Sequence, residues 1–254
     1  METLLKSITK MGNSACVILP KSWINGKARI ELIQKPINIT KDILEILEPH
    51  LQGILGIYLI GSYARGEQTE KSDIDILVIT ENINKKITKG KYEIILISKE
   101  SLEKTLKKNI LPLLPMLKEA KSILNEKLIE DYKKIRLNKE NLKWHIETTK
   151  SALKMQKELI TLAKLENEKV SDGIMYSIIL RLRETYIIDC LKNNEIPTSK
   201  GIRKLVRNLT NSEESYEAYL RSKSNEKEKE VIKTETAKCI YNYIKSEIEK
   251  QNDK

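Results

Sequence analysis

The 254-residue sequence predicts an α+β protein with a small N-terminal β domain, a domain in which a mixed or antiparallel sheet is flanked by helices, and a C-terminal helical bundle. Three observations predict this class. Short alternating apolar and polar runs open the chain, three apolar runs follow in its first half, and only helical periodicity is present beyond about residue 125. The expected domains are therefore residues 1–36, 37–124 and 125–254.

The N-terminal segment reads as short strands. Residues 6–33 alternate in two runs around a Gly12-Asn13 turn and a second turn that starts at Pro20. So few residues cannot bury a core alone, and the segment therefore needs a partner. Residues 1–36 carry six basic and two acidic side chains, a net charge of +4.

The middle segment begins with a helix and continues with strands. Thr40 is the expected N-cap of the helix in "ITKDILEILEPHL". The runs "ILGIYLIGS", "DIDILVIT" and "YEIILIS" predict three strands. The link "ENINKKITKGK" is polar and contains a glycine turn, so the last two strands are expected to pair antiparallel. Ser98 or Ser101 is the expected cap of the helix that follows.

Beyond residue 125 the sequence predicts helices that pack as a bundle. A long periodic stretch starts near residue 140, and a second helix starts at the Ser171-Asp172 cap. The last helix carries apolar residues at helical spacing, namely Val231, Ile240, Ile244 and Ile248.

Charge and cysteine content limit the class of protein. The net charge of +10 favours acidic partners such as nucleic acid or nucleotide phosphates, although a lysine-rich solvated surface gives the same value. Cys16, Cys190 and Cys239 are odd in number and far apart, which is typical of reduced thiols. No apolar run approaches the ~20 residues that span a bilayer. We expect a cytoplasmic protein without a membrane partner.

The stretch "GSYARGEQTEKSDIDILV", residues 61–78, carries the chemistry. Asp73 and Asp75 are two residues apart, so a strand places both carboxylates on one face, while the opposite face, with Ile74 and Ile76, stays apolar. Two adjacent anions repel each other unless a cation lies between them, and hard oxygen ligands suit Mg²⁺. The pattern predicts a strand with a wet, metal-binding face and a dry face.

Gly61 and Ser62 follow the preceding strand directly. Gly61 has no Cβ, so a ligand can approach its backbone, and the Ser62 hydroxyl with the following amides can bind an anion. No Gly-Lys-Ser/Thr follows, so this is not a P-loop. A phosphate grip that faces two metal-binding carboxylates is what nucleotidyl transfer requires.

The same stretch resembles the signature of minimal nucleotidyltransferases of the DNA polymerase β superfamily. Gly61-Ser62, Ala64-Arg65-Gly66 and Ser72-Asp73-x-Asp75 carry the resemblance, which covers residues 38–110. It implies a polymerase-β-type domain that uses Mg²⁺ and an NTP, with ATP expected. It also implies that Gly61, Ser62, Arg65 and Ser72 contact the nucleotide and that Asp73 and Asp75 bind metal.

The family uses a third carboxylate, usually Asp, on the neighbouring strand, where this sequence has Glu93. Glu93 is therefore the candidate third catalytic and metal-binding residue, and a strand-edge charge is the alternative. Arg65 either contacts phosphate or pairs with a carboxylate of the site.

Two flanking resemblances are less specific. Residues 6–33, with "GNS", "V-x-L-P-K" and Trp23, resemble the swapped-hairpin AbrB/MazE-type DNA-binding domains. This implies a homodimer that binds DNA, and a ribbon that only dimerises is the alternative. The helical region is similar to the substrate-binding or HEPN-like bundles that accompany nucleotidyltransferases. His145 is too far from Arg136 for the HEPN ribonuclease motif, so we expect it to be structural.

The sequence thus predicts a Mg²⁺-dependent nucleotidyltransferase that moves an NMP from an NTP to an acceptor held at the helical bundle. Protein, nucleic acid and a small molecule such as an aminoglycoside remain possible acceptors. The alternative is an antitoxin-like or transcriptional regulator that binds DNA and senses nucleotide without turnover.

Overall fold

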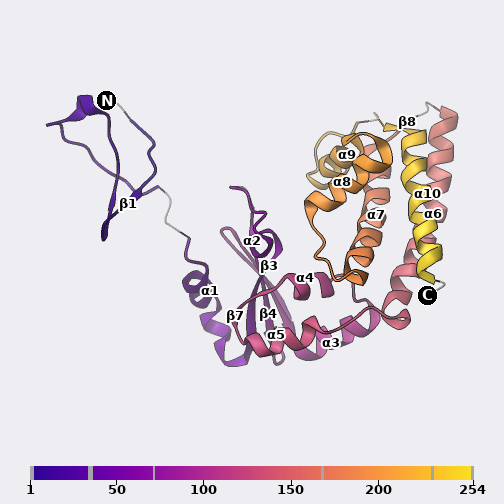
Figure 1. Cartoon of the computed structure of the whole chain (residues 1–254), viewed down its shortest axis with the longest axis horizontal. Helices are drawn as coiled ribbons and strands as arrows, with labels where there is room; N and C mark the ends of the chain where they lie inside the picture. The colour runs from indigo at the N-terminus through magenta and orange to yellow at the C-terminus, as the bar shows by residue number, and fades with distance from the viewer. Residues whose placement is uncertain (1–2, 34–36, 71, 167–168, 230–231, 253–254) are drawn as a thin grey trace. The chain divides into compact units, whose positions relative to one another are not determined.

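The computed structural model describes residues 3–33, 37–70, 72–166, 169–229 and 232–252 (Figure 1). The chain forms two compact units, Met1–Ile43 and Leu44–Lys254. Val231, which the sequence pattern assigned to the last helix, lies outside the described residues.

The first unit contains a hairpin of strands β1 (Thr9–Met11) and β2 (Ser14–Cys16). Gly12, at φ +57°, makes the turn that the Gly-Asn signal predicts, and Pro20 precedes a single 3₁₀ turn, Lys21–Trp23. No strand follows this turn within residues 24–33, so the strands expected in residues 6–33 are limited to this hairpin. Residues 3–33 contain no buried side chain, so within one chain this run has no core to pack against.

Helix α1 (Ile39–Leu47) starts two residues earlier than expected. The Lys41 backbone N–H donates to Asn38 Oδ1 (3.1 Å), so Asn38 is the cap and Thr40 lies inside the first turn. The predicted Thr40 cap is therefore wrong, because Asn38 already offers an equally good capping oxygen two residues earlier.

The second unit is built on a five-stranded mixed sheet in the order β5-β6-β4-β3-β7. Its strands are β3 (Ile54–Ile60), β4 (Ile74–Thr80), β5 (Lys85–Lys89), β6 (Tyr92–Ser98) and β7 (Lys121–Leu124). The predicted α+β class is confirmed.

The expected antiparallel pairing of "DIDILVIT" with "YEIILIS" is wrong. β4 and β6 are parallel neighbours, because the link between them contains a fifth strand, β5, that pairs antiparallel with β6. Gly90, at φ +60°, closes the β5–β6 hairpin. The glycine turn was identified correctly, but it joins β6 to the edge strand and not to β4.

The interior of the sheet is dry on both faces. Leu77 and Ile79 lie on the same face of β4 as Asp75 and are fully buried, as are Ile76 and Val78 on the other face. β4 therefore has no wet face along its length, contrary to the sequence expectation. Asp75, near the start of β4, is the one residue of this strand that is not fully buried.

In the described part of the chain, four short helices lie between and after the strands of the sheet in the sequence. Ser98 caps α3, since its Oγ accepts from the Ser101 backbone N–H (3.2 Å). The short helices are α2 (Gly61–Arg65), α3 (Lys99–Lys108), α4 (Leu114–Glu119) and α5 (Glu126–Lys133). Their apolar side chains, such as Leu102, Leu117 and Ile129, form one core with Leu77 and Ile79 of β4.

The C-terminal region is helical, as predicted. It consists of α6 (Lys139–Glu166), α7 (Asp172–Lys192), α8 (Ser199–Thr210), α9 (Glu214–Lys223) and α10 (Thr234–Asn252). Helices α6 and α10 run side by side, and a two-residue ladder of β8 (Lys169–Val170) and β9 (Ile232–Lys233) lies at their end (Figure 1). Across the described ranges, no helix combines the length and the apolar character needed to cross a membrane.

Candidate active site

The predicted site residues meet at one edge of the sheet. Ile60, the last residue of β3, pairs with Asp75 of β4, and Asp75 pairs with Glu93 of β6. β3 ends where the parallel strands β4 and β6 begin, so Gly61 follows Ile60 at the same edge. The topology therefore brings together residues that are 32 positions apart in the sequence.

The backbone of Gly61 lies close to the carboxylate of Asp75. Its φ is +69°, and a Cβ placed on it would lie 2.2 Å from Asp75 Oδ2. Only glycine allows both the left-handed backbone and this close approach. The backbone that the sequence predicts to grip phosphate thus lies directly against a predicted metal ligand.

Gly61→Ala is expected to displace Asp75 and to lower turnover as well as stability. Gly66→Ala is the matched control, because Gly66 has φ +72° but nothing within 4 Å of an added Cβ. The control pays only the left-handed strain of about 1 kcal/mol. Urea unfolding and a turnover assay on both variants measure the difference, and equal losses in the two would contradict a special role for the Gly61–Asp75 contact.

The Asp75 carboxyl lies in an excess of negative charge. Burial is the first cause of its raised pKa. The carboxylates of Glu93 and Asp73, and then that of Glu119, raise this pKa further. Asp73 itself is exposed at the position before β4. A cation beside Asp75 would relieve this repulsion.

Glu93 is paired with a lysine from the edge strand. Lys86 Nζ donates to Glu93 Oε2 (2.6 Å), and this hydrogen bond is the first cause of the raised pKa of Lys86. The side chains are 58% and 38% exposed, so the pair contributes little stability. Its consequence is local, because one oxygen of the predicted third carboxylate already has a partner.

Arg65 is held by two carboxylates. Its Nε donates to Glu67 Oε2 (2.8 Å) and its Nη1 donates to Glu119 Oε2 (2.5 Å). Arg65 is therefore paired with two carboxylates in this structure, and its contact with a nucleotide phosphate stays a prediction. Glu119 is a residue that the sequence reasoning missed, and no spacing signal connects it with the Gly-Ser motif.

The two serines of the motif lie differently. Ser62 is half-buried in the first turn of α2, and its carbonyl accepts from the Glu67 backbone N–H (2.9 Å). Ser72 holds the loop before β4, since its Oγ accepts from the Thr69 backbone N–H (2.8 Å). Both expected nucleotide contacts remain predictions.

The donor set fits a hard divalent cation held through two carboxylates. Within the described parts of the chain, no three His, Cys, Asp or Glu side chains are arranged to hold a metal ion together. Mg²⁺, however, is usually bound by one or two carboxylates together with substrate phosphates and water. Asp73 and Asp75 are carboxylates of the kind that this requirement names, and the pKa of Asp75 is raised first by burial and then by the neighbouring carboxylates.

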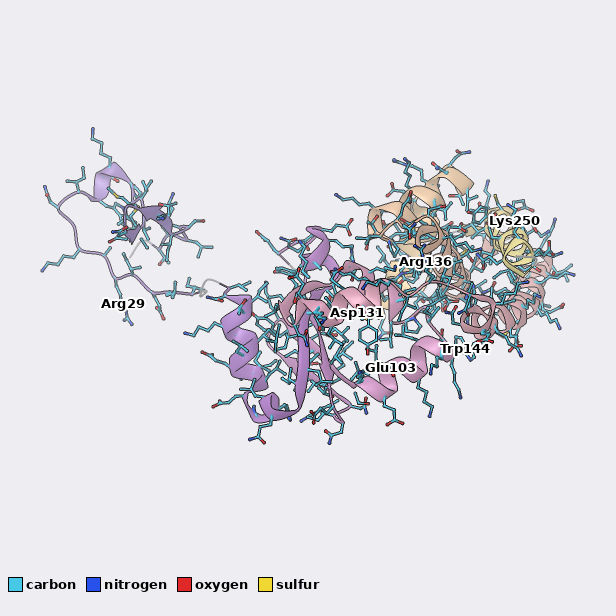
Figure 2. All side chains as sticks on the ribbon, turned by 60° about the horizontal axis from the view of Figure 1, so that its bottom comes forward. Arg29, Glu103, Asp131, Arg136, Trp144 and Lys250 are labelled. Atoms are coloured by element: carbon cyan, nitrogen blue, oxygen red, sulfur yellow. The ribbon has the colours of Figure 1, made fainter. Side chains whose placement is uncertain are left out.

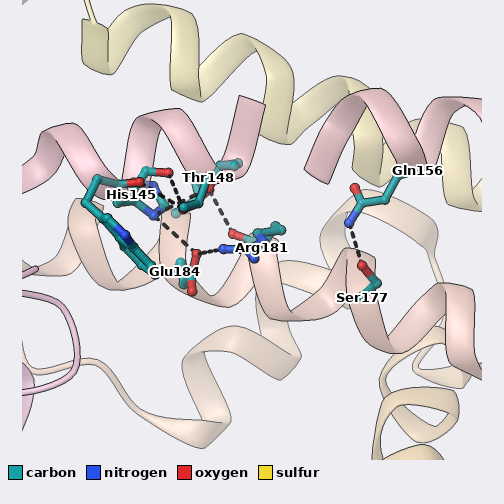
Figure 3. A network of polar contacts seen from close by, with 9 residues as sticks. His145, Thr148, Gln156, Ser177, Arg181 and Glu184 are labelled. Atoms are coloured by element: carbon teal, nitrogen blue, oxygen red, sulfur yellow. Dashed lines mark hydrogen bonds and ion pairs between the residues drawn. The ribbon is translucent and has the colours of Figure 1, made fainter. Parts of the chain in front are cut away.

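His145 lies in α6, away from this edge, in a polar network between α6 and α7 (Figure 3). Its Nδ1 is 3.2 Å from Glu184 Oε2, which also accepts from Arg181 Nη1 (2.8 Å). The His145 side chain is only 1% exposed. The network joins the two helices, in agreement with the structural role expected for His145.

A cavity of about 490 Å³ lies between α3 and the beginning of α6. Glu103 of α3 and Arg136, in the connection between α5 and α6, are among the residues that line it (Figure 2). Its volume falls in the range of small-molecule sites.

Comparison with known proteins gives one family match. The model described as "Nucleotidyltransferase domain" matches residues 40–180, more than half of the chain. Among curated proteins, none matches. A nucleotidyltransferase-like protein from Exiguobacterium sibiricum aligns with a TM-score of 0.40 and 13% identity, over 84% of this chain and 74% of its own. A spectinomycin adenyltransferase from Enterococcus faecialis, solved with ATP and spectinomycin, aligns with a TM-score of 0.42 and 18% identity, over 82% and 97%.

Proposed function

Because the chain belongs to the nucleotidyltransferase domain family, we propose that it transfers an NMP from an NTP to an acceptor in a Mg²⁺-dependent reaction. The observation that carries this proposal is the contact between the Gly61 backbone and Asp75, with Glu93 paired beside it. This contact places a backbone that phosphate can approach beside carboxylates that can hold a cation.

Each residue of the edge has a defined part in the proposal. Asp73 and Asp75 would hold the ion, which when bound neutralises charge on the phosphates. Gly61 and Ser62 would bind and orient the triphosphate, since their backbone lies at the start of α2 beside Asp75. This arrangement supplies positioning and electrostatic stabilisation, which dominate catalysis of phosphoryl-type transfers.

The role of Glu93 distinguishes the two candidate functions, catalysis and nucleotide sensing. As a base or metal ligand it would complete the site, and its backbone pairing with Asp75 supports that role. The Lys86–Glu93 ion pair favours the second candidate, a regulator that binds nucleotide without turnover, because the ammonium contacts an oxygen that would otherwise be open to a metal ion or a proton.

Glu93→Gln is expected to keep NTP binding and to lose turnover, because the amide can neither accept a proton nor supply the charge of a ligand. Binding is measured by calorimetry with an α,β-methylene NTP analogue, and turnover by release of pyrophosphate. Glu100→Gln, an exposed glutamate in the first turn of α3, is the control. Turnover equal to wild type in Glu93→Gln would make Glu93 a structural charge.

We propose that the acceptor binds at the helical region, with the cavity between α3 and α6 as the candidate place. The lining carries cations at Lys107, Lys134 and Arg136 and carboxylates at Glu103 and Glu140, so a polar acceptor suits it. The cavity does not distinguish a small molecule from a side chain or nucleotide end of a macromolecule.

One experiment tests the function as a whole. Purified protein, Mg²⁺ and each of the four α-labelled NTPs are incubated with cell extract, and the labelled product is identified by mass. Label transfer that requires Mg²⁺ is the expected result. Tight NTP binding with no labelled product and no pyrophosphate would support the sensor in place of the enzyme.

The N-terminal unit is proposed to join two copies of the chain and to bind DNA. The absence of buried side chains from residues 3–33 supports the need for a partner, because apolar residues such as Leu5, Ile18 and Ile33 are 83%, 73% and 79% exposed. The net charge of +4 in residues 1–36 supports an anionic ligand such as DNA.

A further inference from the structure

Glu119 lies opposite Gly61 because of the sheet register. β7 pairs with β3 through Lys121 and Leu59, and the strands are antiparallel. Two residues before Lys121, the chain reaches Glu119 at the end of α4, and two residues after Leu59 it reaches Gly61. The Gly61 backbone N–H donates to Glu119 Oε1 (2.7 Å).

The other oxygen of this carboxylate holds Arg65. Arg65 Nη1 donates to Glu119 Oε2 (2.5 Å), and the Glu119 side chain is only 7% exposed. One carboxylate therefore contacts both ends of α2, which starts at Gly61 and ends at Arg65. A paired charge at this depth is costly to separate, because removal of one partner leaves the other uncompensated.

Gly61 is thus enclosed from two sides. On the β4 side an added Cβ would lie 2.2 Å from Asp75 Oδ2, and on the β7 side Glu119 accepts the Gly61 N–H. The distance between the α2 backbone and Asp75 depends on both contacts. In a transfer reaction this is the distance between the phosphate grip and the metal-binding carboxylate.

We propose that Glu119 is a positioning residue for nucleotidyl transfer, which holds α2 at a fixed place beside Asp75 through Gly61 and Arg65. The inference rests on the proposed function. Glu119 acts through these two groups, and the reacting atoms lie beyond them. Its loss should therefore affect kcat more than the ground-state binding of the nucleotide.

Glu119→Ala and Glu119→Gln test the inference by steady-state kinetics with NTP. In Glu119→Ala we expect kcat to fall about 100-fold, because a displacement of 1 Å costs about that factor, while KM changes less than about threefold. Glu119→Gln should fall between the alanine variant and wild type, since its amide oxygen still accepts from Gly61 but no longer pairs as a charge with Arg65.

The control is Glu213→Gln, which removes a partly exposed carboxylate paired with Arg203 in the helical region (3.4 Å) and should leave kcat unchanged. Rates are expressed per folded molecule, with the folded fraction taken from near-UV circular dichroism. A purely structural role would lower the melting temperature without changing that rate. If Glu119→Ala does not fold, the glutamine variant decides.

Three results would overturn the inference. If wild type is active and kcat is unchanged in both Glu119 variants, the positioning role is rejected and the proposed function stands. A lower KM for NTP in Glu119→Gln would mean that Glu119 competes with the triphosphate for the Gly61 amide. An inactive wild type would reject the proposed function and, with it, any positioning role.

Discussion

Asp75→Asn is expected to reduce nucleotide turnover by roughly 1,000-fold or more, because loss of several kcal/mol of transition-state stabilisation costs a factor of ten per 1.4 kcal/mol. Asp73→Asn should cause a comparable loss. Both should remain folded, since the amide keeps the shape of the carboxylate. Pyrophosphate release under saturating Mg²⁺ and NTP measures the effect.

Asp75→Asn should also be more stable than wild type at neutral pH. The pKa of Asp75 is raised above its ordinary value of 3.8 by burial and by the neighbouring carboxylates. A carboxyl group whose pKa is raised on folding favours the folded state below the unfolded pKa and loses that contribution as the pH rises through the folded pKa. The gain in melting temperature of Asp75→Asn should therefore be present at pH 7 and vanish as the pH falls towards 3.8.

Asp189→Asn is the matched control. Asp189 of α7 also has a raised pKa, first from burial and then from Glu247, but it lies in the helical region. It should gain stability at pH 7 without losing turnover. Mg²⁺ should raise the melting temperature of wild type and of Asp189→Asn, and should leave Asp75→Asn unchanged. Turnover of Asp75→Asn at the wild-type rate would contradict the catalytic assignment.

Deletion of residues 1–36 is expected to convert a homodimer into a monomer that still turns over NTP but no longer binds duplex DNA. The physical reason is that residues 3–33 bury no side chain within one chain and concentrate positive charge. Light scattering measures the oligomeric state. The buried core of the second unit lies entirely beyond the deletion, so the folded fraction should not change.

Salt titration tests the DNA half of this prediction. An affinity that comes from phosphate contacts falls steeply with salt, on the order of 1,000-fold between 50 and 200 mM for six or more contacts. Full-length protein should show this dependence and the truncated protein should not bind. A dimeric truncation would contradict the assembly, and full-length protein that ignores DNA at low salt would leave the segment as a dimerisation ribbon.

Local signals predicted the elements that local chemistry specifies. The Ser171 cap, the Ser98 cap and the Gly12 turn are all present, because each depends on residues within four positions of one another. Thr40 failed as a cap because Asn38 competes for the same helix end. The short strand β7 was missed, since its four residues "KSIL" show no distinctive alternation and owe their strand structure to pairing with β3.

The pairing of strands could not be read from the same signals. Under the expected hairpin between β4 and β6, Glu93 at the start of β6 would lie beside the end of β4, far from Asp75. The insertion of β5 makes the two strands parallel, which brings both carboxylates to one edge. Glu93 therefore lies beside Asp75 for a topological reason, and its catalytic role stays a prediction.

By itself, the sequence determined which residue types stand at the site, because Gly61-Ser62 and Asp73-x-Asp75 lie within one short stretch whose spacing is covalent. Only the tertiary structure decided what surrounds them. Glu119 and Lys86 reach the site from α4 and β5 through long-range pairing of strands, and they hold Gly61, Arg65 and Glu93 in place. Such contacts depend on sheet register, which results from the packing of the whole core and leaves no pattern in neighbouring residues.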